Sequence, residues 1–89
     1  MFSKSTKIVN PTGLHARPAS VFVQEAGKFE SEIFIIKGET EINAKSLLGV
    51  MGGGLAKDTA IEIRAEGADE QEAVETLVGM IEAGFGELE

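Results

Sequence analysis

The stretch Ala60–Glu66, AIEIRAE, decides the fold of this chain because it is the clearest strand in the sequence. Apolar Ile61 and Ile63 alternate in it with charged Glu62 and Arg64. A period of two gives a strand one apolar face and one face in contact with water, which is typical of antiparallel sheets covered on one side. We therefore expect this strand to belong to a half-covered sheet.

A long helix is expected after this strand. Asp69 is followed three residues later by Glu72, a pair that resembles a capping box at a helix start. Apolar residues then recur at steps of three and four, the spacing of one helix face; they are Val74, Leu77, Val78, Ile81 and Phe85. This pattern predicts the third and longest helix, and we expect residues 84–89 to be a fraying end.

Three more strands are expected before residue 60. Their patterns cover residues 2–9, 33–36 and 40–43, and the turn formers at residues 37–39 join the last two as a hairpin. The first of these strands is a weak candidate, and the turn formers at residues 10–13 end it.

Two helices complete the expected elements. The first is predicted over residues 16–28, after a turn in which Gly13 takes a positive φ. The second is predicted over residues 47–51, with Ser46 as its N-cap and the triple glycine Gly52–Gly54 as its end.

The order of these elements indicates the fold class. Strand, helix, strand, strand, helix, strand, helix is the split crossover pattern with one extra helix, which favours an antiparallel sheet with helices on one face. A chain of 89 residues is long enough for one core and too short for two. We therefore expect an α+β protein with a single domain over residues 1–89.

Composition excludes several classes of function. Cysteine is absent and there is one histidine, so the common zinc sites, disulfides and thiol chemistry are not expected, and neither metal nor cofactor is predicted. The formal net charge of −7 makes nucleic acids and anionic membranes poor partners. No apolar run has membrane length and no signal peptide is recognisable at the N-terminus, so a cytoplasmic protein with protein partners is expected.

The segment Gly13–Ala19, GLHARPA, is the candidate site because it places the single imidazole at the junction of a turn and a helix. Main-chain N–H groups at a helix start lack partners inside the helix, and together with the helix dipole they attract anions. A phosphoryl group on His15 would meet the N–H groups of Ala16 and Arg17 and the Arg17 guanidinium. Imidazole is nucleophilic near neutral pH, although spacing alone favours a surface cap residue beside a solvated arginine.

Two segments together resemble a known family. GLHARPA at residues 13–19 is similar to the active-site signature of HPr, the phosphocarrier family of the bacterial sugar phosphotransferase system, and the likeness runs through nearly the whole chain. NAKSLLGVM at residues 43–51 resembles that family's regulatory serine segment. The resemblance implies an open-faced β-sandwich, with four antiparallel strands covered on one side by three helices.

The resemblance also implies a function. His15 would become a phosphohistidine at Nδ1 by transfer from enzyme I and would pass the group to an enzyme IIA, with Arg17 assisting. The chain would be a stoichiometric carrier and not an enzyme, and we expect it to be a monomer. Ser46 would be phosphorylated by HPr kinase/phosphorylase, and that form can serve a catabolite-control transcription factor. On spacing alone, Ser46 is better explained as an ordinary cap.

The apolar residues of the second helix have two interpretations. Leu47, Leu48 and Met51 fit a core stripe, yet a helix this short cannot bury all of them, and the resemblance favours docking of partners. Many relatives carry a serine and a leucine where this chain has Gly52 and Gly53, which we expect to loosen the end of that helix and shrink the patch.

Other functions stay open from the sequence. A purely regulatory relative would use Ser46 and carry no phosphoryl flux through His15. A paralogue of a nitrogen system would share the histidine motif and differ in its partner. A split-crossover module for an unknown ligand would need neither motif.

Overall fold

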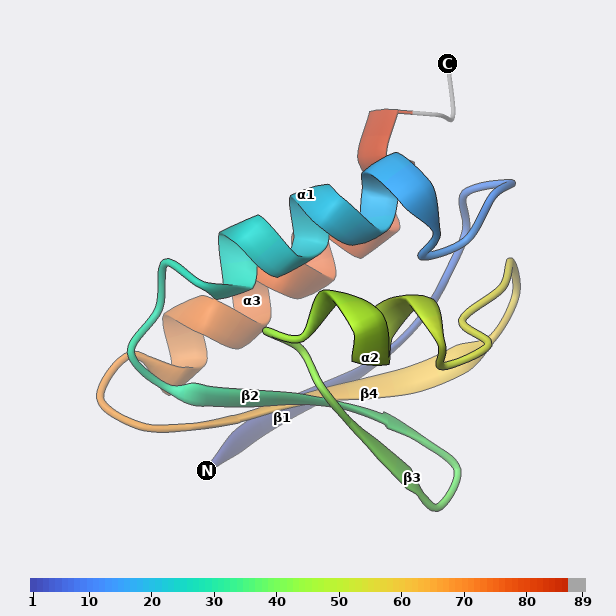
Figure 1. Cartoon of the computed structure of the whole chain (residues 1–89). Coiled ribbons are helices and arrows are strands. Elements are labelled where there is room, and N and C mark those ends of the chain that lie inside the picture. Colours follow the sequence, from blue (N-terminus) through green and yellow to red (C-terminus); the bar gives the residue numbers. More distant parts are fainter. Residues whose placement is uncertain (87–89) are drawn as a thin grey trace.

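The computed structural model describes residues 1–86 (Figure 1). In chain order its elements are β1 (Phe2–Lys7), α1 (Ala16–Ala26), β2 (Glu32–Lys37), β3 (Thr40–Asn43), α2 (Leu47–Met51), β4 (Ala60–Glu66), α3 (Glu70–Glu82) and the 3-10 helix η1 (Gly84–Gly86).

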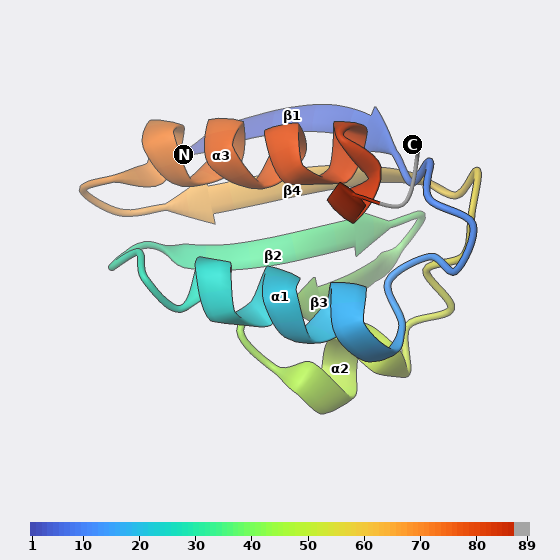
Figure 2. The ribbon, with the colours of Figure 1, turned by 90° about the horizontal axis from the view of Figure 1, so that it is seen from above.

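The four strands form one antiparallel sheet in the order β1-β4-β2-β3. The stretch AIEIRAE is β4, which lies inside the sheet: Ile63 pairs with Lys4 of β1 on one side and with Ile35 of β2 on the other. All three helices lie over the same face, with α3 above β1 and β4 and α1 above β2 (Figure 2). The predicted α+β class, an open-faced sandwich, is confirmed.

The core lies between the covered face of the sheet and the helices. Ile61 and Ile63 of β4 are buried, as their alternation predicts, and α1 contributes Phe22 to the same cluster. Four of the five apolar residues in the stripe predicted for α3 are buried, namely Val74, Leu77, Val78 and Ile81. Each large side chain removed from water in this way stabilises the fold by about 1.5–3 kcal/mol.

Several element bounds differ from the predicted ones. The strand predicted over 2–9 ends at Lys7, the register partner of Ala60, where β4 begins. The helix predicted over 16–28 ends at Ala26, because Lys28 N–H bonds to Glu25 O at 3.1 Å in the tighter i→i−3 pattern. β2 is one residue longer at each end than the predicted 33–36.

The capping box predicted at Asp69 is wrong. The Asp69 side chain makes no cap bond to α3. Its carboxylate instead accepts from the main-chain N–H groups of Glu30 and Ser31, each at 2.9 Å, and from the Ser31 hydroxyl. Hydrogen bonds from that hydroxyl, and next from the Glu30 amide, hold the pKa of Asp69 below its ordinary value of 3.8. Asp69 thus fastens the start of α3 to the turn before β2.

The end of α3 also differs from its prediction. Phe85 does not extend the stripe, because α3 stops at Glu82 and Phe85 lies in η1 with a φ of +54°, half-buried against the core. Residues 84–86 of the expected fraying end therefore form a short 3-10 helix, and residues 87–89 lie outside the described part. Among the described residues, no helix has both the length and the apolar character that crossing a bilayer requires.

Candidate functional site

His15 is the residue immediately before α1, in extended backbone conformation, and its side chain is exposed and makes no capping bond. The preceding residue, Leu14, is only 2% exposed and anchors the loop in the core. The N–H of Leu14 donates to Leu55 O at 2.8 Å, and the Asn10 amide donates to Gly13 O at 2.9 Å. The chain therefore holds a surface imidazole on a loop that is itself well fixed.

Gly13 has the positive φ that the sequence predicts, +68°. A Cβ at this position would meet the Leu55 carbonyl oxygen and would lie 2.9 Å from Ala56 Cα. Both the backbone conformation and the space therefore require glycine here.

The start of α1 offers main-chain donors beside His15. Within residues 1–86, the N–H groups of Ala16 and Arg17 have no main-chain acceptor, and Pro18 has no N–H to pair. An eleven-residue helix adds the positive end of its dipole at the same place. This arrangement can stabilise an anion attached to the imidazole.

Ala16 has a φ of +50°, a conformation that costs an alanine about 1–2 kcal/mol. Such strain is kept only where the surroundings enforce it, and it is common at functional sites. The sequence carries no signal for it, because alanine is not a residue that prefers positive φ.

Arg17 is exposed, and within residues 1–86 its guanidinium makes no hydrogen bond or ion pair. The site thus has a cation two residues from His15 that no described carboxylate neutralises.

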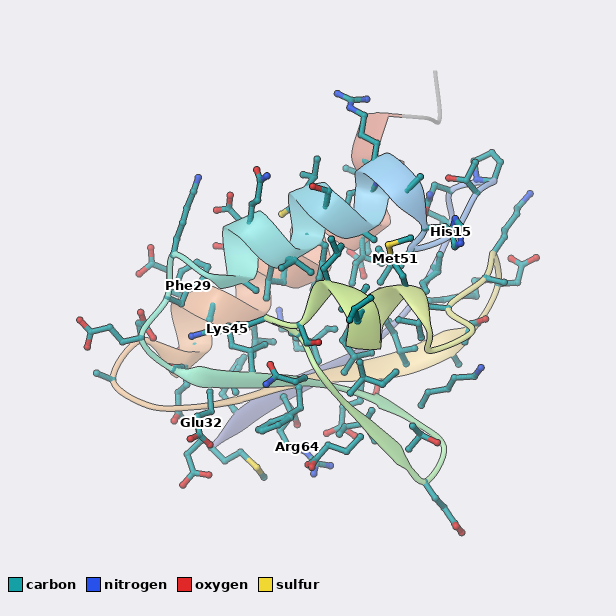
Figure 3. The ribbon with its side chains drawn as sticks, in the orientation of Figure 1. His15, Phe29, Glu32, Lys45, Met51 and Arg64 are labelled. Carbon is teal, nitrogen blue, oxygen red and sulfur yellow. The ribbon has the colours of Figure 1, made fainter. Side chains whose placement is uncertain are left out.

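A shallow hollow of about 150 Å³ lies beside the imidazole. Its lining residues are Thr12, Leu14, His15, Met51, Gly54, Leu55 and Ala56. Figure 3 shows His15 and Met51 at the same end of the molecule, one at the start of α1 and the other at the end of α2. The sequence predicts the start of α1 and the end of α2, whereas no local pattern marks the wall formed by residues 54–56.

Comparison with known proteins decides the family. A family model described as PTS HPr component phosphorylation site matches residues 2–83. The chain belongs to the HPr family. It is 43% identical to phosphocarrier protein HPr of Neisseria meningitidis serogroup A over 98% of each chain. It is 48% identical to HPr-like protein Crh of Halalkalibacterium halodurans, covering 92% of this chain and 98% of the relative.

Solved structures of the HPr family agree. The crystal structure of HPr-C-His from Thermoanaerobacter tengcongensis has a TM-score of 0.95 and 47% identity, over 98% of each chain. The family identification drawn from the two motifs is confirmed, and with it the membership of a phosphocarrier family of the phosphotransferase system.

The second HPr motif forms α2 with the bounds predicted for it. Ser46 is the N-cap, and its Oγ accepts from Gly49 N at 3.1 Å. Val50 is buried, whereas Leu47 is 42% and Leu48 86% exposed. Of the apolar residues of this helix, Val50 therefore belongs to the core, Met51 is half-buried against it, and Leu47 and Leu48 face the solvent.

Lys45, just before Ser46, ties the start of α2 to the turn that follows α1. Its Nζ donates to the Phe29 carbonyl oxygen at 2.7 Å, and Figure 3 shows the two residues near each other, away from His15. The start of α2 is thus fixed relative to α1.

The loosening expected from Gly52 and Gly53 is not what the structure shows. Gly52 N–H bonds to Leu48 O at 2.9 Å, so the helix is closed by an ordinary turn. A Cβ at position 53 would lie 2.5 Å from Ile42 Cδ1. Gly53 therefore packs closely against β3, and a side chain there would have to displace Ile42.

Proposed function

We propose that this chain, acting as a single domain, carries phosphoryl groups on His15 from phosphorylated enzyme I to an enzyme IIA in sugar uptake. The observation that carries the proposal is the exposed imidazole at the start of α1, beside the N–H groups of Ala16 and Arg17, which have no main-chain acceptor within residues 1–86. A phosphoryl group there gains hydrogen bonds and dipole stabilisation without any metal from this chain.

The transfer needs little chemistry from the carrier. The Nδ1 lone pair of His15 forms a bond to phosphorus while the bond from phosphorus to the donor imidazole breaks, and its electron pair returns to the donor ring. The Ala16 and Arg17 amides hold the phosphoryl oxygens, and the Arg17 guanidinium balances their charge. The reverse sequence passes the group on, so the chain turns over as a stoichiometric carrier and not as an enzyme.

Ser46 is proposed as the regulatory site, phosphorylated by HPr kinase/phosphorylase. A phosphate adds a charge of about −1.5 to −2 at pH 7. At this position it would stand next to exposed Leu47 and Leu48, so docking would weaken while the core stays unchanged. The phosphorylated form is then free to serve a catabolite-control transcription factor, which links the site to carbon catabolite repression.

The docking patch is proposed to be Leu47, Leu48 and Met51. Leu47 and Leu48 expose apolar surface on α2, and Met51, half-buried against the core, lines the hollow beside His15. Such a surface suits transient contacts with several protein partners. We propose that the chain works as a monomer in the cytoplasm, without nucleic-acid contact or cofactor. A structure of HPr from Thermoanaerobacter tengcongensis is a dimer, at 47% identity and a TM-score of 0.78, so sedimentation at working concentration is the check.

A regulatory role is the second candidate. It is favoured by the 48% identity to HPr-like protein Crh of Halalkalibacterium halodurans. In that case Ser46 would be phosphorylated and His15 would carry no sugar flux; a nitrogen-system paralogue would use His15 with another acceptor.

Incubation with enzyme I and phosphoenolpyruvate tests the carrier proposal. The expected result is acid-labile phosphate that His15→Ala abolishes and Ser46→Ala retains. Label that persists in His15→Ala would refute the assignment. For Ser46, the expected result with HPr kinase/phosphorylase is acid-stable phosphate that Ser46→Ala removes, and no incorporation would leave the residue as a cap.

A further inference from the structure

One lysine outside the site described above donates hydrogen bonds to the wall of the His15 hollow. Lys37 is the last residue of β2, and its Nζ donates to the carbonyl oxygens of Gly53 at 3.2 Å and Gly54 at 3.0 Å. Both carbonyls belong to the turn that follows α2, and Gly54 itself lines the hollow. Lys37 therefore joins the end of a sheet strand to the segment that faces the imidazole.

The glycine turn has intrinsic backbone freedom that its surroundings must restrain. Three successive glycines have the largest backbone freedom that a chain can have. The main-chain bond from Gly53 N to Val50 O is long, at 3.3 Å. Within residues 1–86, no other side chain donates to the Gly53 or Gly54 carbonyl. The two bonds from Lys37 therefore act together with the Ala56 N–H bond to Gly54 O and the packing of Gly53 against Ile42 in fixing the direction of these peptide groups.

Hydrogen bonds connect these peptide groups to the loop that carries His15. Ala56 N–H bonds to Gly54 O at 3.0 Å, which closes the turn around Leu55. The Leu55 carbonyl then accepts the N–H of Leu14, one residue before His15, at 2.8 Å. Figures 1 and 2 both place the loop before α1 and the segment after α2 side by side at one end of the sheet. A continuous set of hydrogen bonds therefore runs from Lys37 to the backbone that carries the imidazole.

We propose that Lys37 is a positioning residue for phosphoryl transfer at His15. It acts through the glycine turn and the Leu55 carbonyl and does not touch the reacting atoms. An ammonium on a flexible stem suits the task, because it has three donors and can reach two adjacent carbonyls at once. The inference rests on the proposed carrier function of His15.

Three variants test this role. Lys37→Met keeps the apolar stem and removes the donors, and Lys37→Arg keeps donors and charge. Lys57→Met is the matched control, because Lys57 is an exposed lysine close after the same turn that makes no hydrogen bond or ion pair within residues 1–86. All three are compared with the unchanged chain.

The first readout is amide hydrogen exchange at Leu14, divided by exchange at Ile63 in the sheet so that global stability cancels. Lys37→Met is expected to raise this ratio about tenfold, as loss of charge-assisted hydrogen bonds implies. The second is transfer from phosphorylated enzyme I: kcat should fall about tenfold with KM unchanged, because the loop is misplaced and the α2 patch is intact. Lys37→Arg should keep the exchange ratio and kcat close to the values of the unchanged chain.

The proposal is overturned if Lys37→Met leaves the exchange ratio and kcat at their original values, if Lys37→Arg does not restore them, or if Lys57→Met reproduces the losses. Failure of the carrier function itself would look different. The unchanged chain would then take no label from enzyme I, while the exchange ratio would still show whether Lys37 holds the loop.

Discussion

Leu14 donates its main-chain N–H to the carbonyl of Leu55 across 2.8 Å, although the two residues belong to loops far apart in the sequence. Both side chains are nearly buried, at 2% and 4% exposure. The bond therefore joins two residues that are anchored in the core, and His15 follows directly after Leu14. The position of the imidazole depends on the packing of the segment after α2 as much as on α1.

Gly13→Ala should damage this contact. The new Cβ would collide with the Leu55 carbonyl oxygen and approach Ala56 Cα to 2.9 Å, in a backbone with φ +68°. Gly38→Ala is the matched control, because its φ is +60° and nothing lies within 4 Å of its Cβ. Unfolding in urea should show a loss of about 1 kcal/mol for the control and a further ~1–3 kcal/mol for Gly13→Ala. Equal losses in the two variants would mean that the His15 loop can move away from the segment after α2 without a loss of stability.

Gly53→Ala should destabilise the chain by about 1 kcal/mol, because its Cβ would lie 2.5 Å from Ile42 Cδ1 and the buried isoleucine must move. Gly79→Ala in α3 serves as the contrast. Its Cβ meets nothing within 4 Å, so alanine should stabilise the helix by about 1 kcal/mol. Urea midpoints of both variants provide the check, and a stabilised Gly53→Ala would mean that the turn is looser than the packing indicates.

The strands and helix faces could be predicted because their signals are local. The alternation in β4 and the apolar stripe of α3 each lie within about a dozen consecutive residues, and the apolar positions of both patterns are buried. The role of Asp69 could not be read in this way, since its partner Ser31 lies 38 residues away. A capping box and a long-range clamp look alike in sequence, and the fold alone decides between them.

The site likewise has some features that neighbouring residues predict and others that depend on residues distant in the sequence. The position of His15 before α1 and the cap at Ser46 follow from neighbouring residues. The bonds from Lys37 to the glycine turn reach residues that lie 16 and 17 positions away in the sequence, and no residue pattern marks either these bonds or the positive φ of Ala16.

Leu48→Ser should separate docking from stability. Leu48 is 86% exposed, so the free energy of unfolding should change by less than about 0.5 kcal/mol. The KM for phosphorylated enzyme I should rise several-fold, since an apolar contact of the proposed docking patch is lost. Ile36→Ser, on the uncovered face of β2, is the control for docking, and its KM should stay unchanged. An unaltered KM for Leu48→Ser would remove this residue from the proposed patch.

The clamp between Asp69 and Ser31 predicts how stability depends on pH. The pKa of Asp69 is lowered in the folded chain, first by the Ser31 hydroxyl and next by the Glu30 amide. A carboxyl with a lowered folded pKa stabilises the fold above its unfolded value, near 3.8, and loses that contribution as pH falls through the folded value. Asp69→Asn should therefore be less stable than the unchanged chain at pH 7, and the difference should shrink below about pH 4.

Ser31→Ala is the companion variant, because it removes the largest cause of the shift and keeps both main-chain donors. Urea unfolding from pH 7 to pH 2 should give it a loss smaller than that of Asp69→Asn, and nuclear magnetic resonance titration should show the pKa of Asp69 moving up towards 3.8. If the difference between Asp69→Asn and the unchanged chain were the same at pH 2 and pH 7, the ionised carboxylate would not be what holds the start of α3 to the turn before β2.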